Sequence, residues 1–409
     1  MSEEKHIVII WSRYLPYHVA RIRHLRDRLR EVNCRLTAIE VASKDALYPF
    51  PESAESSSIE YRCIFSGKSY RALNPLVISF TIYRAIVELH PDVVIAPATP
   101  FPSGMAAIRY ALLHHKFSIM MDDAWEFSDQ RGKIITMVKK FIHQNIDAAF
   151  IPAPSHAQYF GRMGFPKERM VFGVDVVDNE YYSRHAQVAR DHDSELRKTL
   201  SLPKKYFLFV GRFIPRKGIE SLLKAYLIYR NTTRAPEPWG LVLVGDGDAR
   251  KKYQLEVAPR RHQPDIVFAG SQFGEKLCYY YGLASAFILP SEVETWGLVV
   301  NEALASGLPA IVSKGCGSAQ VLIDEKKNGF TFTYGNSTEI AEYMETIAAL
   351  PSAELTAMAD HSKKIIANWS LNTFADSVIR AIQLPRRERG SWISQFFTVF
   401  WPGRISFYP

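Results

Sequence analysis

Residues 286–309 read AFILPSEVETWGLVVNEALASGLP, and this stretch decides the fold. Its first four residues form an apolar run that predicts a buried strand, and residues 298–305 predict a helix. The loop between them carries Glu294, and Glu302 falls in the first turns of the helix. A buried strand that leads through a polar loop into a helix is the repeating unit of a parallel α/β sheet.

The same alternation extends to both sides of this stretch. Residues 44–70 are the main exception, because their prolines and serines predict an irregular loop. A chain of 409 residues is too long for one hydrophobic core, so two domains are expected. We therefore predict two doubly wound, Rossmann-like α/β domains at 1–183 and 206–384, a polar linker at 184–205, and a basic, aromatic tail at 385–409 that packs back on the first domain.

Two glycine-containing loops follow predicted strands of the second domain. Gly211 ends one strand, and Arg212 and Lys217 follow it before the next helix begins. Glycine lets a backbone approach a ligand closely, and cations beside a helix N-terminus suit a diphosphate. The other loop, Gly-Asp-Gly at 245–247, is typical of turns after parallel strands. For both loops, a solvated surface turn is the alternative interpretation.

The two glutamates at 294 and 302 allow a more specific hypothesis. Carboxylates accept hydrogen bonds from vicinal hydroxyl groups, so two neighbouring carboxylates can hold a ribose and a hexose at once. The backbone N–H groups at the start of the helix can bind phosphate or sugar oxygens. The alternative is that both glutamates are solvated or complement the helix dipole, but this would not require Gly297, Gly307 and Pro309 as well.

Taken together, these segments resemble the retaining glycosyltransferases of family 4, which have the GT-B fold. The resemblance rests on VGRFIPRKG at 210–218, GDG at 245–247, the long block that begins AGSQFGEK at 269, and NGFTF at 328–332, in this order. It covers about residues 206–332 closely and most of the chain more loosely. A GT-B protein has two Rossmann-like domains that face each other across a cleft.

The resemblance implies roles for the residues of the second domain. Glu294 corresponds to the glutamate that contacts the donor sugar, and Glu302 to the one that binds the ribose. Arg212 and Lys217 correspond to the basic pair that holds the donor diphosphate. The residues implied to line the donor site around them are Gly211, Gly245, Thr295, Trp296, Gly297 and Leu298.

The acceptor side is expected in the first domain. The candidates are polar residues at predicted strand ends, namely His18, Asp122, Asp123 and Glu126. For His18, a structural role is an equal alternative. For the aspartate pair, capping is an equal alternative. No Asp-x-Asp motif lies in a metal-binding setting, so we expect no metal and no other cofactor. The donor phosphates would instead be neutralised by the basic pair and the helix N-terminus.

The charge of the chain points to an anionic partner. The net charge is +8 and the pI about 9.1, but no nucleic-acid-binding motif accompanies the charge. Basic residues crowd the first predicted helix at Arg21, Arg23, Arg26, Arg28 and Arg30, and aromatic residues crowd the tail. One interpretation is that both regions form a docking surface for anionic lipids. The alternative is that the helix face is solvated and the tail packs on the protein.

The resulting hypothesis is a retaining, metal-independent glycosyltransferase. It would move a hexose-type sugar from a nucleoside-diphosphate sugar to a glycan, glycolipid or other hydroxyl acceptor. The first residues are unlike a signal peptide and no apolar run is long enough to span a membrane, so we expect a cytoplasmic enzyme, and peripheral binding to the inner face of the membrane is left open. The rival hypotheses are a GT-B-fold sugar-nucleotide epimerase, a phosphorylase, and a non-catalytic GT-B binding protein.

Overall fold

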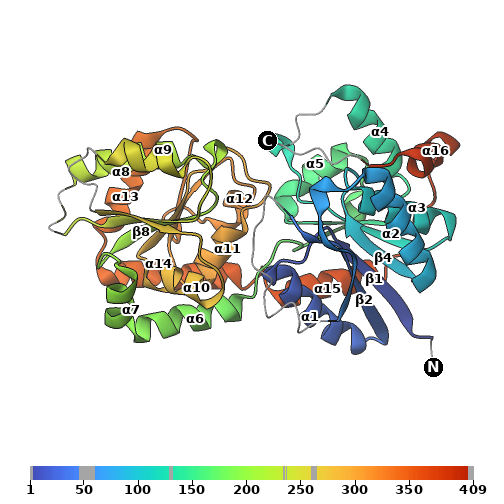
Figure 1. The fold of residues 1–409 in the computed structure, drawn as a ribbon, viewed down its shortest axis with the longest axis horizontal. Helices are drawn as coiled ribbons and strands as arrows, with labels where there is room; N and C mark the ends of the chain where they lie inside the picture. The colour runs from blue at the N-terminus through green and yellow to red at the C-terminus, as the bar shows by residue number, and fades with distance from the viewer. Residues whose placement is uncertain are drawn as a thin grey trace. The chain divides into compact units, whose positions relative to one another are not determined.

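The computed structural model describes residues 3–45, 60–128, 132–233, 235, 237–258 and 265–403. The chain divides into two compact units, of which the first comprises Met1–Val176 and Leu371–Pro409, and the second comprises Val177–Ser370. Each unit contains one sheet with helices on both faces, and every strand pair is parallel (Figure 1). The predicted pair of doubly wound α/β domains is therefore confirmed.

The sheet of the first unit has the strand order β3-β2-β1-β4-β5-β6-β7. Its central strands are buried along their whole length, which explains their continuous apolar sequences. The strands are β1 (Lys5–Trp11), β2 (Cys34–Lys44), β3 (Tyr61–Ser69), β4 (Val93–Pro97), β5 (Phe117–Met121), β6 (Ala148–Ile151) and β7 (Met170–Phe172).

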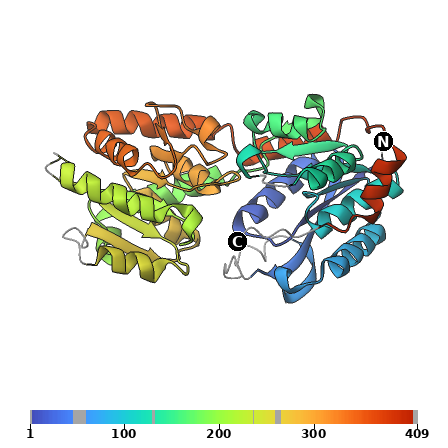
Figure 2. The same cartoon turned by 90° about the horizontal axis from the view of Figure 1, so that it is seen from above.

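Helices cover both faces of this sheet. One face carries α1 and α15, which pack against each other, and the other carries the layer α2, α3, α16 and α4 in that order (Figures 1 and 2). The helices of this unit are α1 (Pro16–Arg30), α2 (Pro75–Leu89), α3 (Pro102–Leu113), α4 (Lys133–His143), α5 (Ala157–Arg162), α15 (Leu371–Ala381) and α16 (Trp392–Phe400).

Strand β3 corrects the prediction of an irregular loop at 44–70. Its sequence YRCIFSGKS includes a glycine and two cations, which weakens the signal for a strand. In the structure the segment pairs with β2 at the edge of the sheet, with Cys63 opposite Glu40. The neighbouring strand therefore supplies the order that local sequence does not. The proline- and serine-rich part of the predicted loop, residues 46–59, lies outside the described residues.

The sheet of the second unit has the strand order β10-β9-β8-β11-β12-β13. Its strands are β8 (Tyr206–Val210), β9 (Gly240–Val244), β10 (Ile266–Gly270), β11 (Ala286–Leu289), β12 (Ala310–Ser313) and β13 (Gly329–Phe332). Its helices are α6 (Asn179–Asp191), α7 (Asp193–Leu200), α8 (Ile219–Thr232), α9 (Arg250–Val257), α10 (Gly274–Leu283), α11 (Leu298–Ala305), α12 (Ala319–Leu322), α13 (Ser337–Ala348) and α14 (Ser352–Ile366).

The boundaries of the two units differ from those of the predicted domains. The predicted linker at 184–205 is mostly helical, and α6 packs on α10 and α11 as part of the second unit. Residues 371–384, predicted to close the second domain, belong to the first unit. Helix α15 is held there by Phe374, which is fully buried against Trp11 and Phe150. Local polarity does not reveal such long-range packing.

The C-terminal tail lies on the first unit, where the prediction placed it. Helix α16 packs against α3 and α4, and the Asn145 side chain donates hydrogen bonds to Ser394 at 2.7 Å and Thr398 at 2.9 Å. Arg389 donates to the carbonyl oxygens of Asn145 and Lys116. Residues 404–409, with the aromatic residues at 407 and 408, lie outside the described part.

Two arginines of the basic helix α1, Arg21 and Arg28, make contacts within the unit. Arg21 is 2% exposed and donates from Nε and one terminal nitrogen to the carbonyl oxygen of Val176, at 2.9 and 2.6 Å. Arg28 forms an ion pair of 2.9 Å with Asp376 of α15. Arg23 and Arg30 of α1 are exposed, so the lipid-binding face considered from the sequence stays a prediction for this helix.

Candidate functional site

The candidate donor site lies at the carboxyl edge of the second sheet. Strand β8 is first in the chain order of this sheet, and its two neighbours are β9 and β11. The chain runs from β8 outward to β9 and β10 and then crosses to β11 on the other side of β8, which makes the carboxyl end of β8 the topological switch point. In open α/β sheets, ligands bind in the crevice formed there. The loops after β8, β9, β11 and β12 surround this point.

The loop after β8 is tied to the loop after β11 by backbone contacts. Gly218 has a φ of +67°, and a Cβ atom at this position would lie 2.0 Å from the carbonyl oxygen of Pro290. The amide of Glu292 donates to the carbonyl oxygen of Arg216 at 2.8 Å. Only glycine permits this close approach, which brings Lys217 to the edge of β11.

Lys217 and Glu294 meet at this junction. The Lys217 ammonium contacts the Glu294 carboxylate directly, and each side chain is 13% exposed. Burial by itself raises the pKa of Glu294, but the neighbouring Lys217 charge and its hydrogen bond outweigh burial and hold this pKa below its ordinary value. The site therefore contains an ionised carboxylate beside a cation. The two residues are far apart in the sequence, and the fold brings them together.

The backbone on either side of Glu294 is fixed by the loop after β12. The Glu294 amide donates to the carbonyl oxygen of Gly315 at 3.0 Å, and the Gly317 amide donates to that of Glu294 at 3.1 Å. Gly297, with φ +93°, then caps the N-terminus of α11. The first amide groups of a helix have no partner within it, so this start can receive an anion or a sugar oxygen.

The Gly-Asp-Gly turn after β9 supports the same edge. Gly245 has a φ of +136°, and a Cβ atom there would lie 1.9 Å from the carbonyl oxygen of Gly211. Asp246 forms an ion pair with Arg250 at 2.8 Å and accepts from the Gly247 amide. The aspartate therefore serves the turn itself, while the glycine lets two loops approach.

Glu302 lies deeper than its predicted ribose-binding role suggests. Its carboxylate accepts a hydrogen bond of 2.7 Å from the Tyr281 hydroxyl, and Tyr182 also hydrogen-bonds to it. The residue is 8% exposed, and burial raises the pKa of Glu302 to about 7, against the effect of both tyrosines. Neither tyrosine was predicted as a site residue. Tyr182 even fell in the predicted first domain, so no local signal connected it with Glu302.

Arg212 and the remaining donor-side residues also lie at this edge. Arg212 follows β8 directly and is partly exposed, and Trp296 is buried with its indole nitrogen bonded to Asn301 at 2.9 Å. Thr295 and Leu298 are partly buried next to them in the chain. The structure thus places the predicted donor-side residues on the loops and the helix around one switch point.

The predicted acceptor-side residues occupy the carboxyl edge of the first sheet. His18 accepts a hydrogen bond of 3.1 Å from the Leu15 amide at the start of α1 and stacks on Trp11 with ring centroids 4.8 Å apart. Burial, and then the charge of Arg21, lower the pKa of His18 well below its usual value. A neutral histidine that accepts from the backbone is acting as a helix cap.

The carboxylates of this edge have several different partners. Asp122 is 8% exposed and accepts from the Ala124 amide at 3.0 Å, which closes a turn. Glu126 forms an exposed ion pair with Arg162 at 3.1 Å. Asp123 is half-buried, and its charge contributes to a raised pKa of about 7 at Asp175, for which burial is the larger cause.

Asp175 was not predicted as a site residue. It lies 3.8 Å from Arg21, and the Arg21 charge partly offsets the effects of burial and of the neighbouring aspartates on its pKa. It is the third residue after β7, and burial is the main cause of its raised pKa. A strongly shifted carboxyl at a strand end is a candidate functional group, although ion-pair networks produce the same effect.

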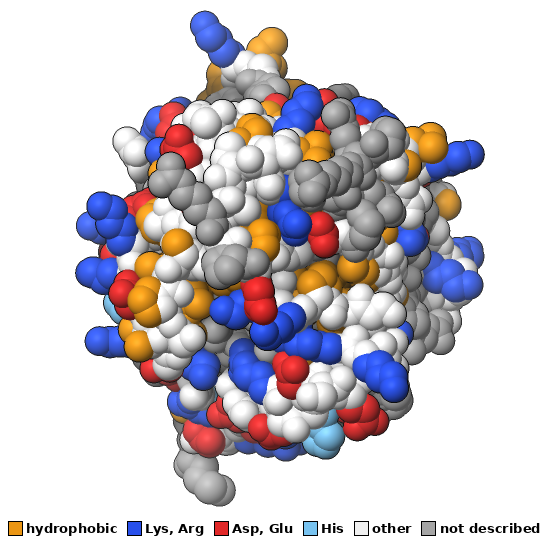
Figure 3. Space-filling view, turned by 90° about the vertical axis from the view of Figure 1, so that its left-hand side faces the viewer, with side chains coloured by type: hydrophobic (Ala, Val, Ile, Leu, Met, Phe, Trp, Pro, Cys, Tyr) orange, Lys and Arg blue, Asp and Glu red, His pale blue; other side chains and the backbone are white. Residues whose placement is uncertain are grey.

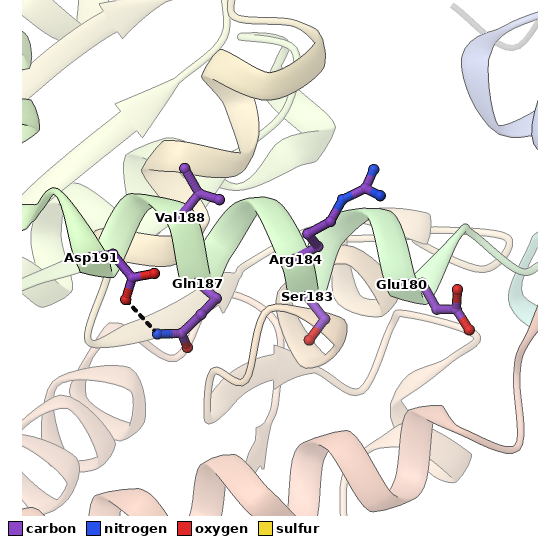
Figure 4. A pocket seen from close by; sticks show the side chains of 6 residues that line it. All are labelled: Glu180, Ser183, Arg184, Gln187, Val188 and Asp191. Atoms are coloured by element: carbon purple, nitrogen blue, oxygen red, sulfur yellow. Dashed lines mark hydrogen bonds between the residues drawn. The ribbon is translucent and has the colours of Figure 1, made fainter.

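Other kinds of site find less support among the described residues. No cluster of three His, Cys, Asp or Glu residues there has the arrangement to hold a metal ion, and no described helix is long and apolar enough to cross a membrane. The four cysteines are free thiols. A shallow groove runs along the outer side of α6 and is lined by Glu180, Ser183, Arg184, Gln187, Val188 and Asp191 (Figure 4). None of the predicted site residues lines it.

Comparison of the sequence with known proteins identifies a family and several relatives. Residues 192–365 match the model of the family described as glycosyl transferases group 1. A GDP-mannose-dependent alpha-mannosyltransferase of Mycobacterium tuberculosis (strain CDC 1551 / Oshkosh) is 30% identical over 266 residues, which are 63% of this chain and 64% of that protein. The first curated relatives are matched over 34% to 64% of their own length, so the chain spans about half of each.

Solved structures identify the fold over nearly the whole chain. A glycosyltransferase from Rickettsia africae superposes with a TM-score of 0.72 at 15% identity, covering 93% of this chain and 98% of that one. Anabaena Alr3699/HepE in complex with UDP superposes with a TM-score of 0.68 at 15% identity, covering 92% and 99%. The two-unit α/β architecture is therefore the GT-B fold.

Proposed function

Residues 192–365 match the model of the family glycosyl transferases group 1, and on this basis we propose that the chain is a retaining, nucleotide-sugar-dependent glycosyltransferase. It transfers a hexose-type sugar from a nucleoside-diphosphate sugar to a hydroxyl group of a glycan or lipid-linked acceptor. The observation that carries the proposal is the contact between Lys217 and Glu294 at the switch point of the second sheet. The solved neighbours include one that holds UDP-glucose, which supports the substrate class.

The donor-side residues supply the electrostatics that this reaction needs. As the bond between the anomeric carbon and the diphosphate breaks, negative charge grows on the leaving phosphate. Lys217, Arg212 and the N-terminus of α11 stabilise that charge. Such fixed donors contribute on the order of several kcal/mol to catalysis, so no metal ion is required.

The two glutamates bind hydroxyl groups of the donor. Glu294, which is ionised, accepts from sugar hydroxyls once its contact with Lys217 is shared with the diphosphate. Glu302 accepts from the ribose, and the tyrosine hydroxyls orient its carboxylate. The acceptor oxygen forms the new bond on the face that the phosphate leaves, and its proton passes to a phosphate oxygen. The sugar therefore keeps its anomeric configuration without a protein base.

The location and the acceptor follow from the same proposal. A donor of this kind is a cytoplasmic metabolite, so we place the chain in the cytoplasm, with peripheral binding to the membrane that carries a lipid-linked acceptor. His18, Asp122, Asp123 and Glu126 remain acceptor-side candidates by position, although the partners of three of them are structural.

Thermal stabilisation by a panel of UDP-, GDP- and ADP-sugars tests the proposal. The correct donor at 100 times its Kd stabilises the folded chain by about 2.7 kcal/mol. We expect the same stabilisation with EDTA present, together with slow donor hydrolysis. If no nucleotide sugar shifts the unfolding midpoint, the proposal is wrong. Stabilisation without hydrolysis or transfer assigns a binding protein instead, and formation of a free sugar phosphate from added phosphate assigns a phosphorylase.

A further inference from the structure

Helix α16 directs three of its four aromatic residues outward. Trp392, Phe396 and Phe400 are 76%, 52% and 68% exposed, and their spacing of four residues places them on one face of the helix. The rings of Phe396 and Phe400 lie 4.7 Å apart, so they form a continuous stripe. Large apolar side chains exposed in a row, rather than singly, mark an interaction surface.

Two of the three polar residues of the same helix, Ser394 and Thr398, are buried, and Gln395 is exposed. Ser394 and Thr398 are fully buried and bonded to the Asn145 side chain, and the Ser394 hydroxyl also donates to the carbonyl oxygen of Phe141 at 2.6 Å. A helix that faces water has the opposite arrangement. Because these hydrogen bonds fix its rotation, α16 cannot turn its aromatic stripe inward without leaving buried polar groups unpaired.

Helix α4 extends this surface. It packs beside α16, and Phe141 of α4 stacks on Phe397 of α16 with ring centroids 5.8 Å apart (Figure 1). One turn and two turns before Phe141, Met137 and Ile134 are 49% and 75% exposed. Two neighbouring helices of the first unit therefore share an exposed apolar face.

The charged side chains of the helices that form and flank this face have one sign. Helices α3, α4 and α16 contain no aspartate or glutamate, while α4 carries Lys133 and Lys140 on its exposed side. Elsewhere the signs are mixed: on the face in Figure 3, basic side chains lie among acidic ones, and Glu220 of α8 pairs with both Lys224 and Lys252. A positive apolar face repels a second copy of itself and attracts an anionic partner.

We propose that the exposed faces of α4 and α16 dock this chain onto an anionic phospholipid membrane. Trp and Phe side chains insert at the boundary of head groups and acyl chains, and the lysines contact the lipid phosphates. Helix α16 has nine residues, far fewer than the roughly 20 needed to span a bilayer, so it lies in the plane of the interface. This inference rests on surface residues of the first unit and is independent of the donor site.

The test is sedimentation of the full chain with vesicles of phosphatidylcholine containing 30% phosphatidylglycerol, compared with phosphatidylcholine alone. We expect Trp392→Gln/Phe396→Gln/Phe400→Gln to lower the partition coefficient on anionic vesicles at least about tenfold. The matched control, Val188→Gln/Leu255→Gln/Tyr334→Gln, changes three exposed apolar residues of the second unit and should bind like the wild type. Lys133→Glu/Lys140→Glu should weaken binding to anionic vesicles only.

Fluorescence gives a second readout that does not depend on a triple variant. Brominated phospholipids should quench wild-type tryptophan emission, and Trp392→Phe should abolish most of that quenching. The proposal is overturned if the wild type does not bind anionic vesicles, or if the triple variant, with an unchanged unfolding midpoint, binds equally well. A concentration-dependent dimer that the triple variant disperses, without vesicle binding, would assign the stripe to a second copy and also overturn it.

Discussion

The carboxyl edges of the two sheets have the same topology and different chemistry. In the second unit, Lys217 and Glu294 reach across two loops and satisfy each other. In the first unit, His18 accepts from the backbone at the start of α1, and Asp122 accepts from the amide of Ala124. At the second edge Lys217 and Glu294 pair with each other, whereas at the first edge His18 and Asp122 accept from nearby backbone amides. The first edge also holds two ion pairs, Glu126 with Arg162 and Asp175 with Arg21.

This difference bears on which of the predicted residues can exchange their present partners for a ligand. An ion pair between side chains can be exchanged for contacts with a charged ligand, because both groups remain satisfied when diphosphate and hydroxyls arrive. A side chain that caps a helix or closes a turn loses a local hydrogen bond if it turns to a ligand. Within the same fold, a side chain is therefore better suited to bind a ligand where its present partner can be exchanged for that ligand.

The largest expected effect tests the exchangeable pair. We expect Lys217→Ala to lower turnover of the identified donor by about 100-fold, because one charged contact to the leaving phosphate is lost. Steady-state kinetics measure the change, and Glu220→Ala, at an exposed carboxylate of α8, provides the control. Turnover within a factor of about three of the wild type would show that the ion pair is only structural.

A second prediction concerns the buried carboxyl of Glu302. Its pKa is raised to about 7, so the folded protein binds this proton more tightly than the unfolded chain, and the stability of the wild type falls as the pH rises from about 4.5 to 7. Glu302→Gln removes this loss. We expect the variant to be more stable by up to about 3 kcal/mol above pH 7 and by almost nothing near pH 4.5.

Urea denaturation at several pH values measures this difference, and Glu325→Gln, at an exposed carboxylate, serves as the control. The same Glu302 variant should bind the nucleotide more weakly, because an amide accepts ribose hydroxyls less strongly than a carboxylate. A variant that is less stable at pH 8, or that binds the nucleotide as the wild type does, would contradict the role assigned to Glu302.

The smallest expected effect tests the structural edge. We expect His18→Ala to cost about 1 kcal/mol of folding free energy, the usual value of a helix cap, and to leave turnover unchanged. Guanidinium denaturation measures the stability, and the donor assay measures the turnover. Loss of transfer to the acceptor with unchanged donor binding would instead give His18 an acceptor role and remove the contrast between the two edges.

Much of the fold was predictable because buried parallel strands have continuous apolar sequences. The strand at 286–289 and the helix at 298–305 occur in the structure with the predicted bounds. Strand β3 and the long helix α6 were missed, because the sequence of each is polar and the partner that orders it is distant in the chain. For the donor side, glycine spacing and charge drew attention to Arg212, Lys217, Glu294 and Glu302, and the roles that the resemblance implies for them stay predictions.

The sequence by itself determined the alternation of strands and helices, the glycines that allow loops to meet, and the charges on those loops, because each depends on neighbouring residues. Only the tertiary structure decided which groups became partners. It placed Tyr182 and Tyr281 against Glu302, returned Phe374 to the first unit, and turned the aromatic stripe of α16 outward. These contacts join residues far apart in the chain, and their energies depend on burial, which no local pattern specifies.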